Sequence, residues 1–197
     1  MKATFFALLT GTLLSAFSGY AAAECDKESA LFNDGWCLYA GAGLTYSYLH
    51  PDRNGSSWRV NDEYGHGIEL TLGTRLSDHW YTEVSYVDLG SAGLVNINPA
   101  IEGTYRIDYR APAGWVQYRL MGDEADRQWD VFLRAGLSFM INKSSDPILP
   151  FAEQTTVQFP VGAAVQWWPE PAWSLRLKLD SYDYDVYSLS GAVLYEF

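Results

Sequence analysis

The chain has 197 residues, enough for one domain, and 16% of them are aromatic. Its formal net charge of −11 argues against a nucleic-acid partner. Beyond the N-terminal segment, no apolar run reaches the roughly 18 residues that a membrane-spanning helix needs.

The first residues have the pattern of a secretory signal peptide. A basic start at Met1-Lys2 is followed by a mostly apolar stretch over residues 5–17 and by three alanines that end at Ala23. We expect residues 1–23 to be a signal peptide cleaved after Ala23. The alternative is an N-terminal membrane anchor, for which the apolar stretch is short. Residues 24–35 are then an N-terminal periplasmic segment.

Two cysteines, Cys25 and Cys37, lie close to this predicted mature N-terminus. In an oxidising compartment we expect them to form a disulfide. The alternative is lipidation of Cys25, but Glu24 is not the small residue that precedes a lipidated cysteine.

Alternation with a period of two predicts three strands in the first half of the chain. Residues 38–48 put Leu38, Ala40, Ala42, Leu44, Tyr46 and Tyr48 on one face. Residues 68–75 oppose Ile68, Leu70 and Leu72 to Glu69, Thr71 and Arg75. Residues 80–87 oppose Trp80, Thr82, Val84 and Tyr86 to Tyr81, Glu83, Ser85 and Val87.

The fourth predicted strand, residues 105–120, changes its parity part-way. Tyr105, Ile107 and Tyr109 form its first apolar face, opposite Arg106, Asp108 and Arg110. After residues 111–114 the apolar set becomes Val116, Tyr118 and Leu120. Because Pro112 and Gly114 stand at the change, we expect a β-bulge there.

Four more strands follow, over residues 129–139, 157–167, 173–180 and 187–197. Their polar faces carry charges in the fifth strand (Asp130, Arg134) and in the seventh (Arg176, Lys178, Asp180). The last strand alternates to its final aromatic residue, Phe197.

Eight strands of this length suit a membrane-spanning barrel. Long polar connections (49–65, 89–103, 141–155) alternate with short ones (77–79, 169–171), as in outer-membrane barrels. We therefore expect an all-β, eight-stranded antiparallel up-and-down transmembrane β-barrel over residues 36–197, closed by pairing of its first and last strands. The alternative is a soluble barrel or sandwich, whose apolar face would point inward.

Three stretches, LYAGAGLTYSYL (38–49), YTEVSYVDLGSAG (81–93) and IDYRAPAGWVQYRL (107–120), resemble the OmpA-like transmembrane domain family. The resemblance covers residues 36–197 and implies a location in the outer membrane of a Gram-negative bacterium. The alternation ending at Tyr195 and Phe197 resembles the C-terminal signal that the barrel assembly machinery recognises. The periplasmic peptidoglycan-binding domain that the family often adds is not expected here.

By this parity the predicted lumen holds a network of charges that must be paired or hydrated. Its members are Glu69, Arg75, Glu83, Arg106, Asp108, Arg110, Asp130, Arg134, Arg176, Lys178 and Asp180, with Arg119 left unassigned. Because eight strands leave an interior that side chains can fill, we favour a salt-bridged plug. The alternative is a narrow pore gated by these salt bridges.

An enzymatic site is not expected, and neither is a catalytic residue, a metal or a cofactor. His50 and His66 flank a long acidic loop and His79 stands in a short turn beside Asp78, positions where solvated histidines are common. An outer-membrane lipid-modifying enzyme is the least favoured alternative. We expect a monomer with a structural or surface-interaction role. Its partners would be outer-membrane lipid and lipopolysaccharide, with a surface ligand or phage at the outer loops.

Overall fold

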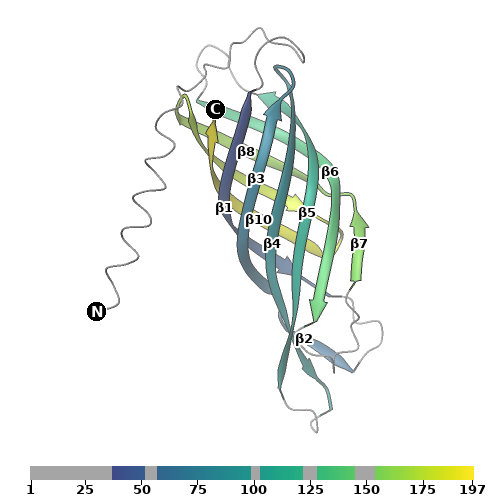
Figure 1. Ribbon diagram of the computed structural model, residues 1–197. Coiled ribbons are helices and arrows are strands. Elements are labelled where there is room, and N and C mark those ends of the chain that lie inside the picture. Colours follow the sequence, from purple (N-terminus) through teal and green to yellow (C-terminus); the bar gives the residue numbers. More distant parts are fainter. Residues whose placement is uncertain (1–36, 52–56, 99–102, 122–127, 145–153) are drawn as a thin grey trace, which may run out of the picture.

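The computed structural model describes residues 37–51, 57–98, 103–121, 128–144 and 154–197. Its antiparallel strands are tilted around a common axis (Figure 1). They are β1 (Leu38–Leu49), β2 (Trp58–Asp62), β3 (Tyr64–Arg75), β4 (Trp80–Asn96), β5 (Thr104–Met121), β6 (Trp129–Ser144), β7 (Gln154–Gln158), β8 (Val161–Glu170), β9 (Trp173–Ser181) and β10 (Val186–Glu196). None of the described residues forms a helix long and apolar enough to cross a membrane.

The sheet closes on itself. The ring order is β1-β3-β4-β5-β6-β8-β9-β10, and β10 returns to β1 with a continuous register from Tyr39↔Glu196 to Leu49↔Val186. The two remaining segments extend this ring, since β2 pairs with β4 beyond β3, and β7 pairs with β6 beyond β8. The predicted eight-stranded antiparallel barrel is confirmed. The predicted signal peptide (1–23) and periplasmic segment (24–35) lie outside the described residues.

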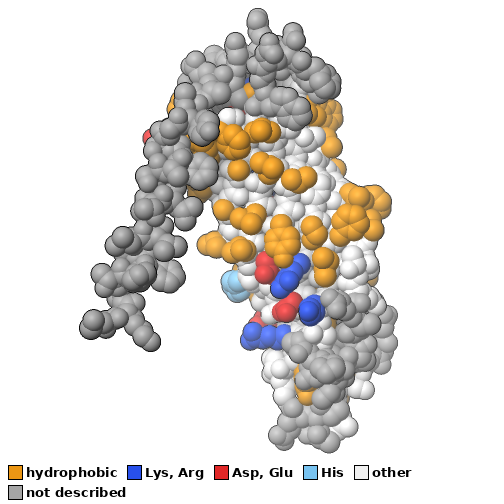
Figure 2. Space-filling view, viewed as in Figure 1, with side chains coloured by type: hydrophobic (Ala, Val, Ile, Leu, Met, Phe, Trp, Pro, Cys, Tyr) orange, Lys and Arg blue, Asp and Glu red, His pale blue; other side chains and the backbone are white. Residues whose placement is uncertain are grey.

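The outer wall of the barrel is apolar. Figure 2 shows hydrophobic side chains spread over it. Exposed aliphatic residues recur on the ring strands: Leu44, Ile68, Leu70, Leu72, Val84, Val116, Leu133, Val165, Leu175, Leu177, Leu179, Leu189 and Val193. A soluble barrel would bury these side chains, so the structure excludes the soluble alternative and fits a wall that meets lipid.

Aromatic rings line the rim that carries the short turns. Trp80 packs on Tyr118, Trp129 on Trp167 and Trp173 on Tyr195, with centroid separations of 4.9, 6.0 and 4.8 Å. Such girdles mark the water boundary of membrane barrels. The C-terminal Phe197 stacks on Tyr195 at 6.3 Å, and its backbone N–H donates to the Leu38 carbonyl.

The expected bulge in β5 was wrong. Residues 107–119 keep one parity throughout, with Ile107, Tyr109 and Trp115 all buried. The register between β4 and β5 shifts on β4, between Asp88 and Gly90, where Gly90 has a φ of 82°. On β5 itself, the register against β6 shifts only near the end of the strand, between Arg119 and Met121. The apolar face changes in the sequence because the two parts of β5 have different surroundings. Ile107 and Tyr109 face an apolar interior, whereas Val116 and Leu120 lie on the exposed apolar wall.

Beyond the apolar wall, the barrel reverses its polarity. The strands extend into the predicted long connections as a sheet of β2, β4, β5, β6 and β7 (Figure 1). The inner face of this end is a packed apolar cluster: Leu49, Trp58, Val87, Leu89, Ala92, Leu94, Ile107, Tyr109, Ala111, Ala113, Trp115, Met140, Tyr182 and Val186. Charged side chains gather on the outside, below the hydrophobic wall in Figure 2. This end has the organisation of a water-soluble protein.

Candidate functional site

The lumen of the barrel contains a balanced set of buried charges. Among the described residues, the buried ionisable side chains with formal charge are Glu69, Glu83, Asp130 and Asp180 on the acidic side and Arg119, Arg134, Arg176 and Lys178 on the basic side. These side chains come from β3, β4, β5, β6 and β9. Since the four positive and four negative charges cancel, the lumen holds no net charge that would need counter-ions.

Glu83 is the centre of this network. Its Oε1 atom accepts a hydrogen bond from Arg134 at 3.1 Å. Its Oε2 atom accepts from Arg176 at 2.6 Å, from the Gln117 amide at 2.9 Å and from the Tyr39 hydroxyl at 3.0 Å. The carboxylate therefore ties β4 to β1, β5, β6 and β9 across the lumen, and four donors replace the water lost on burial.

The two arginines that bind Glu83 are themselves held in place. The Nε atom of Arg134 lies 3.3 Å from Asp180, and its guanidinium stacks 3.8 Å from the centroid of Trp115. Arg176 donates from Nε to Gln166 at 2.7 Å. Because a guanidinium is a planar fork of donors, it can bind two acceptors at once.

Two further ion pairs flank this centre. Lys178 binds Glu69, which also accepts a hydrogen bond from Thr71. On the other side, Arg119 lies 3.5 Å from Asp130, whose second oxygen accepts from the Trp168 indole at 2.7 Å. Together with the contacts of Glu83, these pairs place buried charged side chains from five strands of the ring in the lumen.

The structure brings most of the predicted charge network together, but four of its predicted members lie elsewhere. Arg75 lies at the short-turn rim and binds Asp78 at 2.6 Å. Arg106, Asp108 and Arg110 do not face the lumen, so their assignment was wrong. They lie on the outer side of the extended sheet, where Arg110 pairs with Asp88 and Asp108 with Lys143 across strands.

Sequence reasoning missed several lumenal residues. Arg119 was unassigned because the expected bulge left its parity open, yet it is buried at 4% exposure. Tyr39, Gln117 and Gln166 complete the network as uncharged partners. Counting parity inward from Tyr118 alone would have placed Gln117 and Arg119 correctly.

The apolar cluster closes the lumen above the charges, at the long-loop end. Tyr182, in the turn between β9 and β10, packs edge-on against Trp115 at 6.1 Å. Burial raises the pKa of the Tyr182 phenol well above its ordinary value, so the ring stays neutral at physiological pH. The cluster excludes water where the described strands leave the apolar wall.

The remaining predicted residues lie at the two rims. Cys37 is disulfide-bonded, and its predicted partner Cys25 lies outside the described residues. Of the histidines, His50 contacts Glu63 at 2.8 Å at the long-loop end, His66 packs on Tyr46 and His79 stacks on Tyr118. Within the described part of the chain, no three metal-ligating side chains gather in one place.

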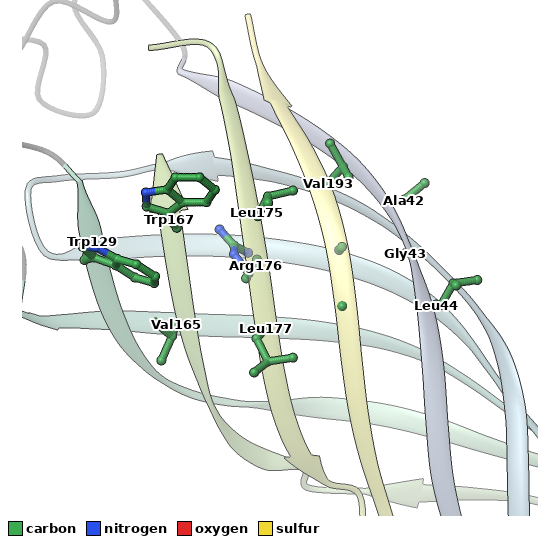
Figure 3. Close-up of a pocket in the computed structure, with 12 residues that line it drawn as sticks. Ala42, Gly43, Leu44, Trp129, Val165, Trp167, Leu175, Arg176, Leu177 and Val193 are labelled. Atoms are coloured by element: carbon green, nitrogen blue, oxygen red, sulfur yellow. The ribbon is translucent and has the colours of Figure 1, made fainter. Parts of the chain in front are cut away.

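A shallow hollow of about 710 Å³ lies on the outer wall (Figure 3). Trp129 and Trp167 lie on one side of it, and Ala42, Leu44 and Val193 on the other. Gly191 of β10 also lines the hollow, and a Cβ atom added to it would meet no atom within 4 Å. Apart from Arg176, whose guanidinium is bound in the lumen, the lining side chains offer apolar contact only.

Comparison with sequence profiles of known families found no match, and neither did comparison with curated proteins. Several solved structures are similar. Neisserial surface protein A matches with a TM-score of 0.51 and 14% identity, over 83% of this chain and 100% of that one. The N-terminal β-barrel domain of OprF from Pseudomonas aeruginosa matches with a TM-score of 0.52 and 11% identity, over 83% and 100%.

A third similar structure is Ail, the attachment invasion locus protein of Yersinia pestis, in complex with the heparin analogue sucrose octasulfate. Its TM-score is 0.50 at 14% identity, over 83% of this chain and 100% of that one. These likenesses show the fold: this chain forms a small β-barrel of the outer-membrane type. At the level of fold, the resemblance to OmpA-like transmembrane domains is confirmed.

Proposed function

We propose that the chain is an outer-membrane protein of a Gram-negative bacterium with a structural or surface-interaction role and a closed lumen. The observation that carries this proposal is the filled interior, where a charge-balanced network around Glu83 lies beneath a packed apolar cluster. A conducting pore needs a continuous hydrated path, and both layers oppose one. The apolar wall and its aromatic rim support the membrane location.

The test is planar-bilayer conductance of the refolded mature chain, residues 24–197. A heat-dependent shift in gel mobility first verifies that the barrel has folded. We expect a folded, electrically silent barrel. Discrete channel events from the unaltered chain would contradict the closed lumen.

The second candidate is a narrow pore gated by the same ion pairs. Its support is that the Glu83 carboxylate binds both Arg134 and Arg176. One of these ion pairs could therefore open while the other still holds the carboxylate. In this case Glu83→Ala and Arg134→Ala would raise conductance above that of the unaltered barrel. Silent variants that retain the heat-dependent mobility shift would eliminate this candidate.

A non-enzymatic role is part of the proposal. At the long-loop end, the His50–Glu63 contact is supported by stacking of His50 on Tyr48, a common arrangement for a surface histidine. Incubation with purified lipid A, followed by mass spectrometry, tests this point. A modified lipid product would overturn it.

A role in surface interaction has independent support from the fold. The hydrogen-bonded sheet that extends beyond the apolar wall carries charges of both signs on its outer side, including Asp88, Asp108 and Arg110. A barrel of the same fold, Ail, has been observed with a bound heparin analogue. Loops and extensions on a rigid scaffold are frequent binding positions.

A further inference from the structure

Within the described part of the chain, the strand β7 is paired along one edge only. It continues β8 in the same register on β6, from Gln158↔Ser138 to Val161↔Ala135. On its other side, none of the described residues forms a strand with it. Figure 1 shows β7 beside β6 at the flank of the sheet.

The edge is open because β9 ends too early. β8 pairs with β9 up to Val161↔Ser181, and the chain then turns through residues 182–185 into β10. The Tyr182 N–H closes this turn on the Val186 carbonyl. No segment of β9 therefore reaches alongside β7.

The orientation of the free backbone groups follows from Pro160. Its carbonyl points toward β6, where it accepts from the Gly136 N–H at 2.9 Å. Because successive residues of a strand point their backbone groups to opposite sides, Thr155, Val157 and Phe159 direct their N–H and C=O groups away from β6. This is a short ladder of donors and acceptors at the open edge.

Neither side chains nor charges protect this edge. Thr155, Thr156 and Val157 are exposed, so neither face of β7 is covered by the described residues. Phe159 is 77% exposed. Residues 154–159 contain no charged residue. The strand β2, in contrast, carries Arg59 and Asp62, the kind of charge that keeps natural edges from pairing.

The β9–β10 turn beside this edge is acidic, whereas on the partner strand β6 the basic Lys143 follows directly after the residues that pair with β7. The β9–β10 turn contains Asp183 and Asp185 and no basic residue, and the whole chain carries a net charge of −11. If the register of β8 and β9 continued, Asp183 would lie opposite Phe159. A segment that enters this position would therefore meet carboxylates, which favours a basic one.

We propose that the free edge of β7 is a docking site for an extended, basic polypeptide segment, which adds to the sheet as a further strand. Backbone hydrogen bonds to Thr155, Val157 and Phe159 hold it, and the carboxylate of Asp183 selects its charge. The proposal rests on the outward-facing role proposed above, because β7 must lie on the external side of the membrane.

A second copy of the chain does not fit this edge. Two barrels inserted in the same direction are related by an axis along the membrane normal, so their β7 strands rise in the same sense. Strand tilts of about 35–45° would then make the two edges cross rather than pair. A separate extended segment has no such restriction.

The test uses the refolded mature chain in lipid nanodiscs and synthetic peptide probes. The first probe is a fluorescent octapeptide of alternating lysine and valine. The second replaces lysine by glutamate, and the third is the first with alternate backbone nitrogens methylated. We expect the first to bind and to protect the amides of Thr155, Val157 and Phe159 from hydrogen exchange. The methylated peptide should bind at least about tenfold more weakly, the cost of one lost hydrogen bond. The glutamate peptide should bind more weakly because the carboxylates of the β9–β10 turn repel it.

Variants of the barrel separate backbone from side chain. Val157→Pro removes an N–H that points away from β6, and we expect about tenfold weaker binding with an unchanged mobility shift on heating. Val157→Ala keeps the N–H and should bind like the parent. Asp183→Asn should weaken binding of the lysine peptide and reduce its salt dependence.

Three outcomes would overturn the proposal. One is equal binding of the lysine, glutamate and methylated peptides. Another is protection of the three amides in the barrel without peptide, which shows that the edge is already covered. The third is a dimer cross-linked through Val157→Cys. None of these depends on conductance, so a failure here is distinguishable from a failure of the closed-lumen proposal.

Discussion

Glu83 shows how one residue can determine the interior of a small barrel. A carboxylate at 2% exposure loses its hydration on folding, and hydrogen bonds from Arg134, Arg176, Gln117 and Tyr39 replace it. Such a group adds little net stability compared with an apolar residue, but its loss leaves partners unpaired. Its contribution is therefore to specify which strands face one another across the lumen.

Replacing this carboxylate tests its role. We expect Glu83→Gln to lower the free energy of unfolding by about 3–5 kcal/mol, because Arg134 and Arg176 are left as incompletely compensated buried charges. Urea unfolding of the refolded barrel in lipid measures this change.

The matched control for Glu83 is Asp108→Asn on the outer side of the extended sheet. That carboxylate is opposite Lys143 but faces outward. We expect its loss to cost no more than about 1 kcal/mol. Equal losses for the two variants would show that the lumenal network has no special role.

At the scale of single strands, close packing between neighbouring strands also restricts which residue can occupy a position. Tyr39 on β1 lies opposite Gly73 on β3, and its ring occupies the space where a side chain at residue 73 would begin. This close approach aims the Tyr39 hydroxyl at Glu83. A glycine at this position is therefore required by packing and not by its backbone angles.

A methyl group at residue 73 should disturb the charge network indirectly, because it displaces the Tyr39 ring that binds Glu83. We expect Gly73→Ala to destabilise the barrel by about 1–3 kcal/mol, the cost of overpacking a filled interior. The control is Gly191→Ala on the outer wall, where an added methyl group meets no atom within 4 Å. Its thermal midpoint should stay close to that of the parent, and a loss equal to that of Gly73→Ala would contradict the packing argument.

The strands also show how far the sequence predicts this fold. Period-two alternation placed β1, β9 and β10 correctly, because the exposed apolar residues of each strand lie on one face. It failed in β5, since Ile107 and Tyr109 face inward although they are as apolar as the outward residues Val116 and Leu120. Alternation reveals two faces but not which one meets lipid.

The candidate site was predictable to the same extent. Glu69, Glu83, Asp130, Arg134, Arg176, Lys178 and Asp180 lie on strands whose outer face is apolar throughout the predicted span. The exact pairs, such as Glu83 with Arg176, were not predictable, because they join strands that are distant in the sequence. Parity from Tyr118 could place Gln117 in the lumen, but its residue type did not indicate that it binds Glu83.

For the whole molecule, the main feature is the reversal of polarity along the barrel axis. The central wall is apolar outside and charged inside, whereas the extended sheet is charged outside and apolar inside. The central wall buries its charged side chains away from an apolar medium, and the extended sheet buries its apolar side chains away from water. The reversal therefore fits a boundary between lipid and water at the end of the barrel that carries the extended sheet.

This boundary makes a prediction for charged substitutions. Leu177→Arg, on the apolar wall, should destabilise the folded barrel in lipid by about 2–4 kcal/mol, as is typical near the midplane of a bilayer. Ile97→Arg should have almost no effect, although Ile97 is more exposed than Leu177 (68% against 55%). Reversible folding into lipid vesicles measures both. Equal costs would place Ile97 in the same medium as Leu177.

The seam between β1 and β10 has a consequence for the time course of folding. Every residue pair from Tyr39↔Glu196 to Leu49↔Val186 joins the beginning of the barrel sequence to its end. Contacts of such long sequence separation form slowly, because the entropy of a very large loop must be lost before they stabilise the chain. Until the last strand arrives, β1 presents an unpaired edge to its surroundings. We therefore expect closure of this seam to be the slow, late step in the folding of the barrel.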